Sequence, residues 1–148
     1  MDTHDRVILT SFPLLLQTNY KPTSPHTISY NCIAWALGDD SKVWWPNSQY
    51  FWPDGILNEV SIKAFTSMFA LYGYIECPSE KLEKGFEKIA LYVDDQNFPT
   101  HASRQLRNGR WTSKLGGSKD IEHALNELTQ SDYGKVVKIY KRPKTSKK

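Results

Sequence analysis

The sequence predicts an α+β fold in which N-terminal helices pack on a small antiparallel sheet. Segments with helical spacing of apolar residues lie in the first half of the chain, and short runs rich in strand-forming residues lie in the second half. Two of those runs flank Asn108-Gly109, and Asn-Gly is a strong signal for an antiparallel hairpin. Helices followed by a strand meander are typical of α+β proteins.

The helices are predicted first. One is expected to begin near Cys32, where an apolar run to Leu37 follows a segment rich in Pro, Thr and Ser (22–29). The second is expected over 60–72, because apolar side chains recur there at i, i+3, i+4 and i+7. The segment between them, 39–53, is predicted to be a loop dense in aromatic residues.

Strands dominate the rest of the prediction. They are expected over 88–93, 100–106, 110–115 and 134–140. One more helix is predicted before the last strand, capped by Asp120 or Ser118, with an apolar stripe of Ile121, Ala124, Leu125 and Leu128. On that helix His123 would point away from the stripe, towards solvent.

Length and charge indicate one domain. A chain of 148 residues builds one sizeable core, which we assign to residues 1–143, with 144–148 as a basic disordered tail. Much of the net charge of +3 lies in that tail, so the body is near neutral and nucleic-acid binding is not expected. Cys32 and Cys77 show no metal-binding or redox spacing, so we expect no metal and no cofactor.

The N-terminal residues bear on the compartment. The apolar run 7–16 is broken by Pro13 and polar residues and is too short to span a membrane. An acidic start without a small-residue cleavage site does not fit a signal peptide. We therefore expect a cytoplasmic protein that does not bind membranes, with export by a signal-independent route left open.

Cys32 is the candidate nucleophile. At the first turn of a helix, a cysteine meets backbone N–H groups and partial positive charge, which favour the thiolate and can hold an oxyanion. His101, at the start of a central strand, is the best candidate base, and Asn31 or His26 could assist the oxyanion. The alternative for Cys32 is simple packing in a core helix, and for His101 a half-buried histidine bonded to a neighbour.

Three tryptophans near this helix are the candidate substrate wall. Trp44, Trp45 and Trp52 lie in the aromatic loop, where they could stack against a ligand or cover the core as a lid.

Several motifs also carry a resemblance. They are YNCIAWA from Tyr30, EKIALY from Glu87, THASRQ from Thr100, GRWTSKLG from Gly109 and DIEH from Asp120. Together they resemble a family of uncharacterised small bacterial proteins over roughly residues 30–143. At the level of fold the chain also resembles papain-like cysteine peptidases and amidases of the NlpC type.

The NlpC-type resemblance implies roles for particular residues. Cys32 matches the nucleophile, but Lys88 stands where those enzymes carry their catalytic histidine. His101 would then act from the neighbouring strand, oriented by Ser113, Gln105 or His123, with Ser113 our choice. Alternatively, the catalytic pair is broken.

The sequence thus favours a papain-like cysteine hydrolase. Cys32 would attack an amide of a protein or peptide substrate, giving hydrolysis, deamidation or acyl transfer, with an effector or toxin-like role left open. The alternative is a non-enzymatic protein-binding module that uses the tryptophans with Arg104, Arg107 and Arg110. The oligomeric state is not predicted.

Overall fold

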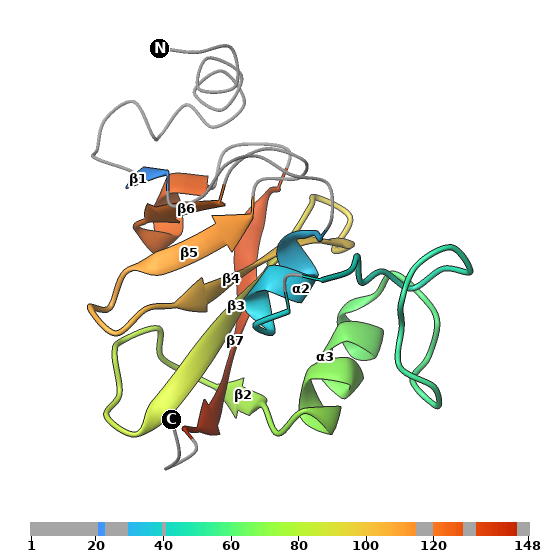
Figure 1. Cartoon of the computed structure of the whole chain (residues 1–148), viewed down its shortest axis with the longest axis horizontal. Helices are drawn as coiled ribbons and strands as arrows, with labels where there is room; N and C mark the ends of the chain where they lie inside the picture. The colour runs from blue at the N-terminus through green and yellow to red at the C-terminus, as the bar shows by residue number, and fades with distance from the viewer. Residues whose placement is uncertain (1–20, 23–29, 40, 115–119, 129–132, 145–148) are drawn as a thin grey trace.

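The computed structural model describes residues 21–22, 30–39, 41–114, 120–128 and 133–144. These residues form one antiparallel sheet with two helices on one of its faces (Figure 1). The α+β prediction, with helices packed on an antiparallel sheet, is confirmed. Of the predicted tail only Lys144 is described, and its N–H donates to the Gly85 carbonyl at 2.8 Å.

The described residues contain seven strands, two α-helices and a short 3-10 helix. In chain order they are β1 (Lys21–Pro22), α2 (Cys32–Ala36), α3 (Ile62–Leu71), β2 (Ile75–Cys77), β3 (Phe86–Val93), β4 (Pro99–Gln105), β5 (Trp111–Lys114), β6 (Asp120–His123), the 3-10 helix η2 (Leu125–Leu128) and β7 (Lys135–Pro143). The strands are ordered β1-β6-β5-β4-β3-β7-β2 across the sheet, and each neighbouring pair is antiparallel.

Both α-helices begin at a side-chain cap. Asn31 accepts a hydrogen bond from the Ala34 N–H, and Ser61 accepts one from the Ala64 N–H. Such caps satisfy N–H groups that have no partner within the helix. In Figure 1, α2 crosses in front of the central strands and α3 lies beside it.

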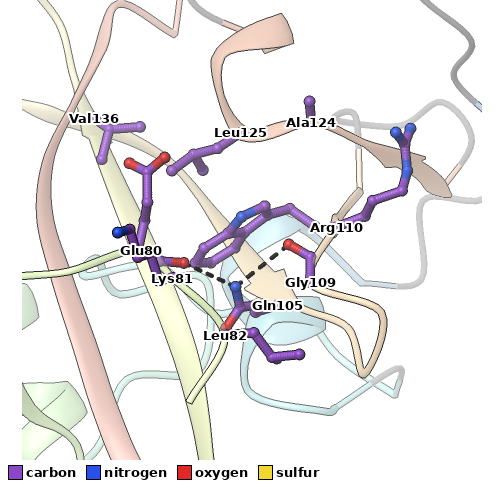
Figure 2. Close-up of a pocket in the computed structure, with 10 residues that line it drawn as sticks. Glu80, Lys81, Leu82, Gln105, Gly109, Arg110, Ala124, Leu125 and Val136 are labelled. Atoms are coloured by element: carbon purple, nitrogen blue, oxygen red, sulfur yellow. Dashed lines mark hydrogen bonds between the residues drawn. The ribbon is translucent and has the colours of Figure 1, made fainter.

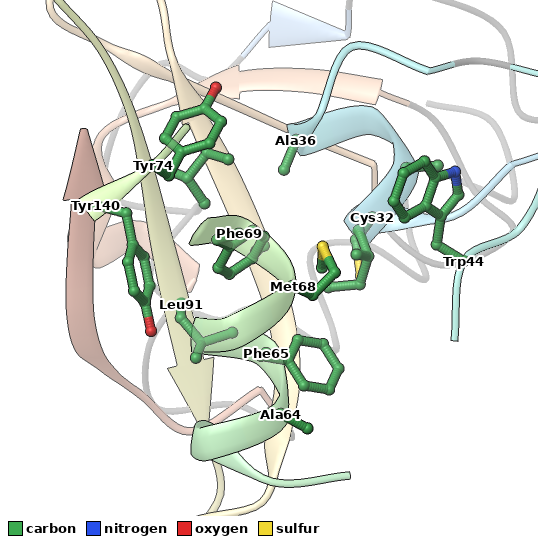
Figure 3. Packing of buried hydrophobic residues seen from close by; sticks show 14 of the residues in the cluster. Cys32, Ala36, Trp44, Ala64, Phe65, Met68, Phe69, Tyr74, Leu91 and Tyr140 are labelled. Carbon is green, nitrogen blue, oxygen red and sulfur yellow. The ribbon is translucent and has the colours of Figure 1, made fainter. Parts of the chain in front are cut away.

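The helix-covered face of the sheet holds the larger core. Its buried members come from both helices, the aromatic loop and the inward side of the strands: they include Ile33, Ala34, Ala36, Ala64, Phe65, Met68, Phe69, Ile89, Leu91, Ala102 and Tyr140 (Figure 3). The helical spacing of Phe65, Met68 and Phe69 places all three on the buried side of α3.

The second face of the sheet carries a smaller core under η2. It contains Ala90, Tyr92, Trp111, Ile121, Leu125 and Leu128. Successive side chains of a strand point to opposite faces, so Ile89 and Leu91 of β3 face the helices, whereas Ala90 and Tyr92 face η2. The same alternation sorts the polar residues of β4 and β5.

The prediction of a helix that begins after Asp120 is wrong for the first part of that segment. Residues Asp120–His123 form strand β6, which pairs with β5 through Ser113↔Ile121 and Trp111↔His123. Only Leu125–Leu128 is helical, as a 3-10 turn. Pairing with β5 satisfies the backbone and buries Ile121 and His123 on one face, so His123 is fully buried and not directed towards solvent.

Candidate functional site

Cys32 is the first residue of α2 and lies inside the larger core. Its side chain is 7 % exposed, and Figure 3 shows it in the same apolar cluster as Met68 and Trp44. Burial raises the pKa of the Cys32 thiol to about 11, although hydrogen bonds with the backbone and the charge of Lys114 act in the opposite direction. The helix start therefore does not produce a thiolate at neutral pH.

His101 lies on the other face of the sheet. The next residue of β4, Ala102, belongs to the core that contains Cys32, whereas the His101 ring stacks on Tyr133 with centroids 4.0 Å apart. Because neighbouring side chains on a strand point in opposite directions, the sheet separates the Cys32 sulfur from the His101 imidazole. The expected Cys32–His101 pair does not form.

His101 instead belongs to a buried polar cluster centred on Ser113. The Ser113 Oγ lies 2.9 Å from His101 Nε2, 2.7 Å from His123 Nε2 and 2.7 Å from Ser103 Oγ. The Tyr92 hydroxyl is 3.2 Å from Ser103 Oγ and donates to the Leu125 carbonyl. We call Tyr92, His101, Ser103, Ser113 and His123 the Ser113 cluster.

The hydrogen-bond partners of His123 determine which atoms of this cluster carry the protons. Its Nδ1 lies 2.7 Å from the Ala124 carbonyl and must donate, so in the neutral ring Nε2 accepts the Ser113 hydroxyl proton. Ser113 Oγ can then accept from His101 Nε2–H. The remaining His101 nitrogen, Nδ1, is buried and has no hydrogen-bond partner among the described residues.

Burial keeps both histidines uncharged. It lowers the pKa of His101 well below 6.5, and His123 adds to this effect. It also lowers the pKa of His123 to about 4, against the hydrogen bond to the Ala124 carbonyl. All the side chains of the Ser113 cluster are enclosed, since His101, Ser103, Ser113 and His123 have no exposed surface. The structure thus places Ser113 beside His101, but in a sealed core.

The other expected site residues hold the core together. Asn31 Oδ1 accepts from the Trp44 N–H and its amide donates to the Trp44 carbonyl, in addition to capping α2. The indole N–H of Trp44 donates to Asp39, and that of Trp52 donates to the Leu57 carbonyl. His26 lies outside the described residues.

The aromatic loop is a lid. The rings of Trp45 and Trp52 pack on Phe65 of α3, with centroids 5.5 and 5.1 Å away. Trp44 and Trp52 are buried. The cleft wall expected from these tryptophans is therefore not formed, and the loop covers α3.

Lys88 also has a structural position. It is buried on the second face, and its Nζ donates to the carbonyls of Ser79 and Lys81 at 2.8 Å and pairs with Glu83 at 3.3 Å. These bonds anchor the connection 78–85, which follows β2, to the sheet.

An open groove lies on the second face, between that connection and η2. We call it the Trp111 groove; its volume is about 670 Å³, and its lining residues are Glu80, Lys81, Leu82, Gln105, Gly109, Arg110, Trp111, Ala124, Leu125 and Val136 (Figure 2). Gln105 ties two sides of the groove together, because its Nε2 donates to the Glu80 carbonyl and points to that of Gly109.

A smaller groove adjoins the first. It has a volume of about 410 Å³ and is lined by Glu76, Cys77, Pro78, Glu80, Val136, Val137, Lys138 and Ile139. Glu80 and Val136 line both grooves, so the two lie side by side. We call the smaller one the β7 groove.

Sequence reasoning missed both grooves. A usable signal was present for the floor of the first, because Trp111 and Ser113 alternate with Thr112 and Lys114 on a predicted strand and so share one face. The walls had no such signal, since they come from four segments that only the fold brings together.

The fold and this site define an α+β protein with an open groove on the sheet face away from its helices. A family model described as a domain of unknown function (DUF7689) matches residues 21–141, and the chain belongs to that family. No curated protein and no solved structure matches the chain, so the papain-like resemblance has no solved structure in support of it.

The described residues contain neither a candidate metal cluster nor a candidate membrane-spanning helix. Within them, no group of three or more His, Cys, Asp and Glu side chains could hold a metal ion. No helix in this part of the chain has the length and apolar character needed to cross a membrane.

Proposed function

We propose that the protein is a binding module that takes a segment of a partner protein into the Trp111 groove. The observation that carries this proposal is the make-up of the groove: an apolar floor with charged and amide groups around it, open to solvent. Leu82, which is 51 % exposed, and half-buried Val136 supply apolar surface for a side chain to cover, above a closed floor formed by Trp111 and Leu125. Arginine is one of the residues that dominate the energetics of protein interfaces, and Arg110 also lines the groove.

A peptide segment fits this groove better than a compact ligand. The Trp111 and β7 grooves share Glu80 and Val136 and lie side by side, so together they offer a site longer than either groove alone. Its rim carries both signs of charge, with Glu80 next to Lys81 and Arg110 held by Glu122 at 2.9 Å. A polypeptide offers the matching mixture of apolar side chains, polar backbone and charges.

The positions of Cys32 and His101 support a binding module over a hydrolase. A nucleophile needs a base within hydrogen-bond reach and access for its substrate. Cys32 has a raised thiol pKa in a closed core, and the imidazole lies on the opposite face.

The binding surface differs from the one expected from the sequence. Trp44 and Trp52 are buried, and the guanidinium of Arg104 lies over Trp35, 4.9 Å from the ring centroid. Of the three arginines considered, Arg110 lines the groove. The surface we propose is therefore the Trp111 groove, in which Leu82 is exposed and Trp111 forms the closed floor.

Selection from a displayed random-peptide library against the full chain tests the proposal. Selected peptides should bind the wild type with micromolar affinity and bind the Leu82→Asp variant at least tenfold more weakly, because Leu82 lines the groove and is 51 % exposed. Leu57→Asp is the matched control, since Leu57 is 47 % exposed and does not line the groove.

The location of binding is checked by NMR. The indole N–H signal of Trp111, assigned with a Trp111→Phe variant, should shift on peptide addition more than the signals of Trp44 and Trp52. Peptides whose affinity falls equally in both leucine variants, or that leave the Trp111 signal unchanged, would contradict the proposal.

A further inference from the structure

The edge of β7 is only partly paired. On one side β7 pairs with β3 from Lys135 opposite Val93 to Pro143 opposite Phe86, with a register shift at Val137. On its other side β2 pairs with Ile139, Tyr140 and Lys141 alone. Among the described strands none pairs with residues 135–138 on that side, so backbone N–H and C=O groups there face the β7 groove.

Pro78 is the reason that β2 stops. Cys77 is opposite Ile139, so the next residue, Pro78, would be opposite Lys138. Proline has no N–H to donate to the ladder. The chain leaves the edge at this point and crosses the second face as the connection 78–85, which Lys88 holds in place.

We propose that the partner segment binds in extended form, as an added strand on the edge of β7 at residues 135–138, in line with β2. This inference rests on the proposed function and specifies how the partner is held. An exposed edge can accept an extended peptide through main-chain hydrogen bonds, while flanking pockets select its side chains. The β7 groove provides the space along this edge, and Val136 connects it to the Trp111 groove.

The charges of the lysines along this edge of β7 favour an acidic partner segment. Lys138 is already neutralised, since its Nζ lies 2.8 Å from Glu76. Lys135 is exposed, and no ion pair to it is found among the described residues. A carboxylate of the incoming strand would be complementary to Lys135.

The same charges disfavour a second copy of the chain as the occupant. A symmetric antiparallel pair of β7 strands centred between Val136 and Val137 would place Lys135 of one copy opposite Lys138 of the other. A second copy would therefore bring no free carboxylate to Lys135, because the Glu76 carboxylate beside Lys138 is already paired with it. A partner strand with alternating acidic and apolar residues supplies that carboxylate.

Amide hydrogen exchange on the full chain tests the inference directly. The probes are the selected peptides and a synthetic peptide, acetyl-(Glu-Val)₄-amide. Binding should slow exchange of the edge-facing amides within 135–138 at least tenfold. The peptide should bind the Lys135→Glu variant at least fivefold more weakly and the Lys63→Glu variant with unchanged affinity, because Lys63 is exposed on α3.

Backbone methylation of the peptide separates strand addition from side-chain binding. N-methylation on alternate residues removes donors from one edge of the peptide only. One of the two methylated forms should lose binding at least tenfold and the other should retain it. Equal binding of both forms, or exchange at 135–138 that does not change, overturns the proposal.

The remaining outcomes distinguish this inference from the proposed function. Binding that depends on Leu82 but leaves the edge amides unprotected overturns strand addition and leaves the groove as a binding site. Protected edge amides with no effect of Leu82→Asp support strand addition and remove the Trp111 groove from the interface. Concentration-dependent dimerisation that protects the same amides without peptide assigns the edge to a second copy and overturns the proposal.

Discussion

Cys32 and His101 are held on opposite faces of the same sheet, with β4 between them. Ala102 packs under α2 with Cys32, and the adjacent His101 bonds to Ser113 under η2. Ala102 and His101 are neighbours on β4 but point to opposite faces of the sheet. Cys32, which packs with Ala102, is therefore separated from His101, its predicted partner. Cys32 and His101 are each buried in a separate core. The candidate site is therefore the surface groove and not Cys32.

Cys32 should resist alkylation in the folded protein. With a pKa of about 11, its thiolate fraction at pH 8 is on the order of one in a thousand, and its side chain is buried. In a Cys77→Ser variant, iodoacetamide at pH 8 should modify Cys32 at least a hundredfold more slowly before urea denaturation than after it. Rapid labelling of the native protein, with an apparent pKa below 8, would restore Cys32 as a candidate nucleophile.

The free energy of unfolding should fall as the pH is lowered from about 6.5 to about 4. The pKa of His123 is about 4 in the folded protein and near 6.5 when unfolded, so within this window the unfolded chain binds the additional proton. Stability therefore rises with pH across the window and is fully present above it. His123 alone accounts for roughly 3 kcal/mol, and His101 acts in the same direction.

Urea denaturation between pH 4.5 and 7.5 measures this dependence, with His123→Gln as the comparison. The variant should lose part of the slope. An NMR titration gives an independent check, because the His123 ring signals should stay constant from pH 7.5 to 5. A native titration midpoint near 6.5 would mean that the ring is solvated.

Ser113→Ala should destabilise the protein by roughly 2–3 kcal/mol, because it leaves polar groups of His101, His123 and Ser103 buried without their shared partner. Ser48→Ala is the control, since Ser48 is exposed in the aromatic loop, and its effect should stay within about 0.5 kcal/mol. Chemical denaturation at pH 7.5 measures both. Equal effects of the two changes would contradict the hydrogen-bonded cluster.

Gly134→Ala should be severely destabilising, by about 3 kcal/mol or more. Gly134 has φ of 83°, and a Cβ atom there would lie 1.9 Å from the Val93 carbonyl oxygen. Gly85→Ala is a matched control: its φ is 87°, but nothing lies within 4 Å of an added Cβ, so only the backbone cost of about 1–2 kcal/mol applies. Thermal unfolding of both variants measures their loss of stability. The difference between the two losses is the cost of the steric clash at Gly134.

Local sequence signals located most elements well. The helix expected over 60–72 is α3, Ile62–Leu71, and the strand expected over 88–93 is β3, Phe86–Val93. Spacing of apolar residues was sufficient because each of these elements buries one regular face. The prediction for the segment after Asp120 was wrong because the spacing of its apolar residues fits a strand as well as a helix. Pairing with β5 makes residues Asp120–His123 a strand.

The sequence by itself determined the α+β class, the helix that begins at Cys32 and the hairpin at Asn108-Gly109, because periodicity, caps and turn residues act over a few neighbouring positions. The tertiary structure alone decided which face each polar side chain occupies and what lies across from it. Strand pairing buried His123 beside Ser113 and kept Cys32 from His101. It also assembled the Trp111 groove from four distant segments, since contacts between such segments depend on the packing of the whole chain.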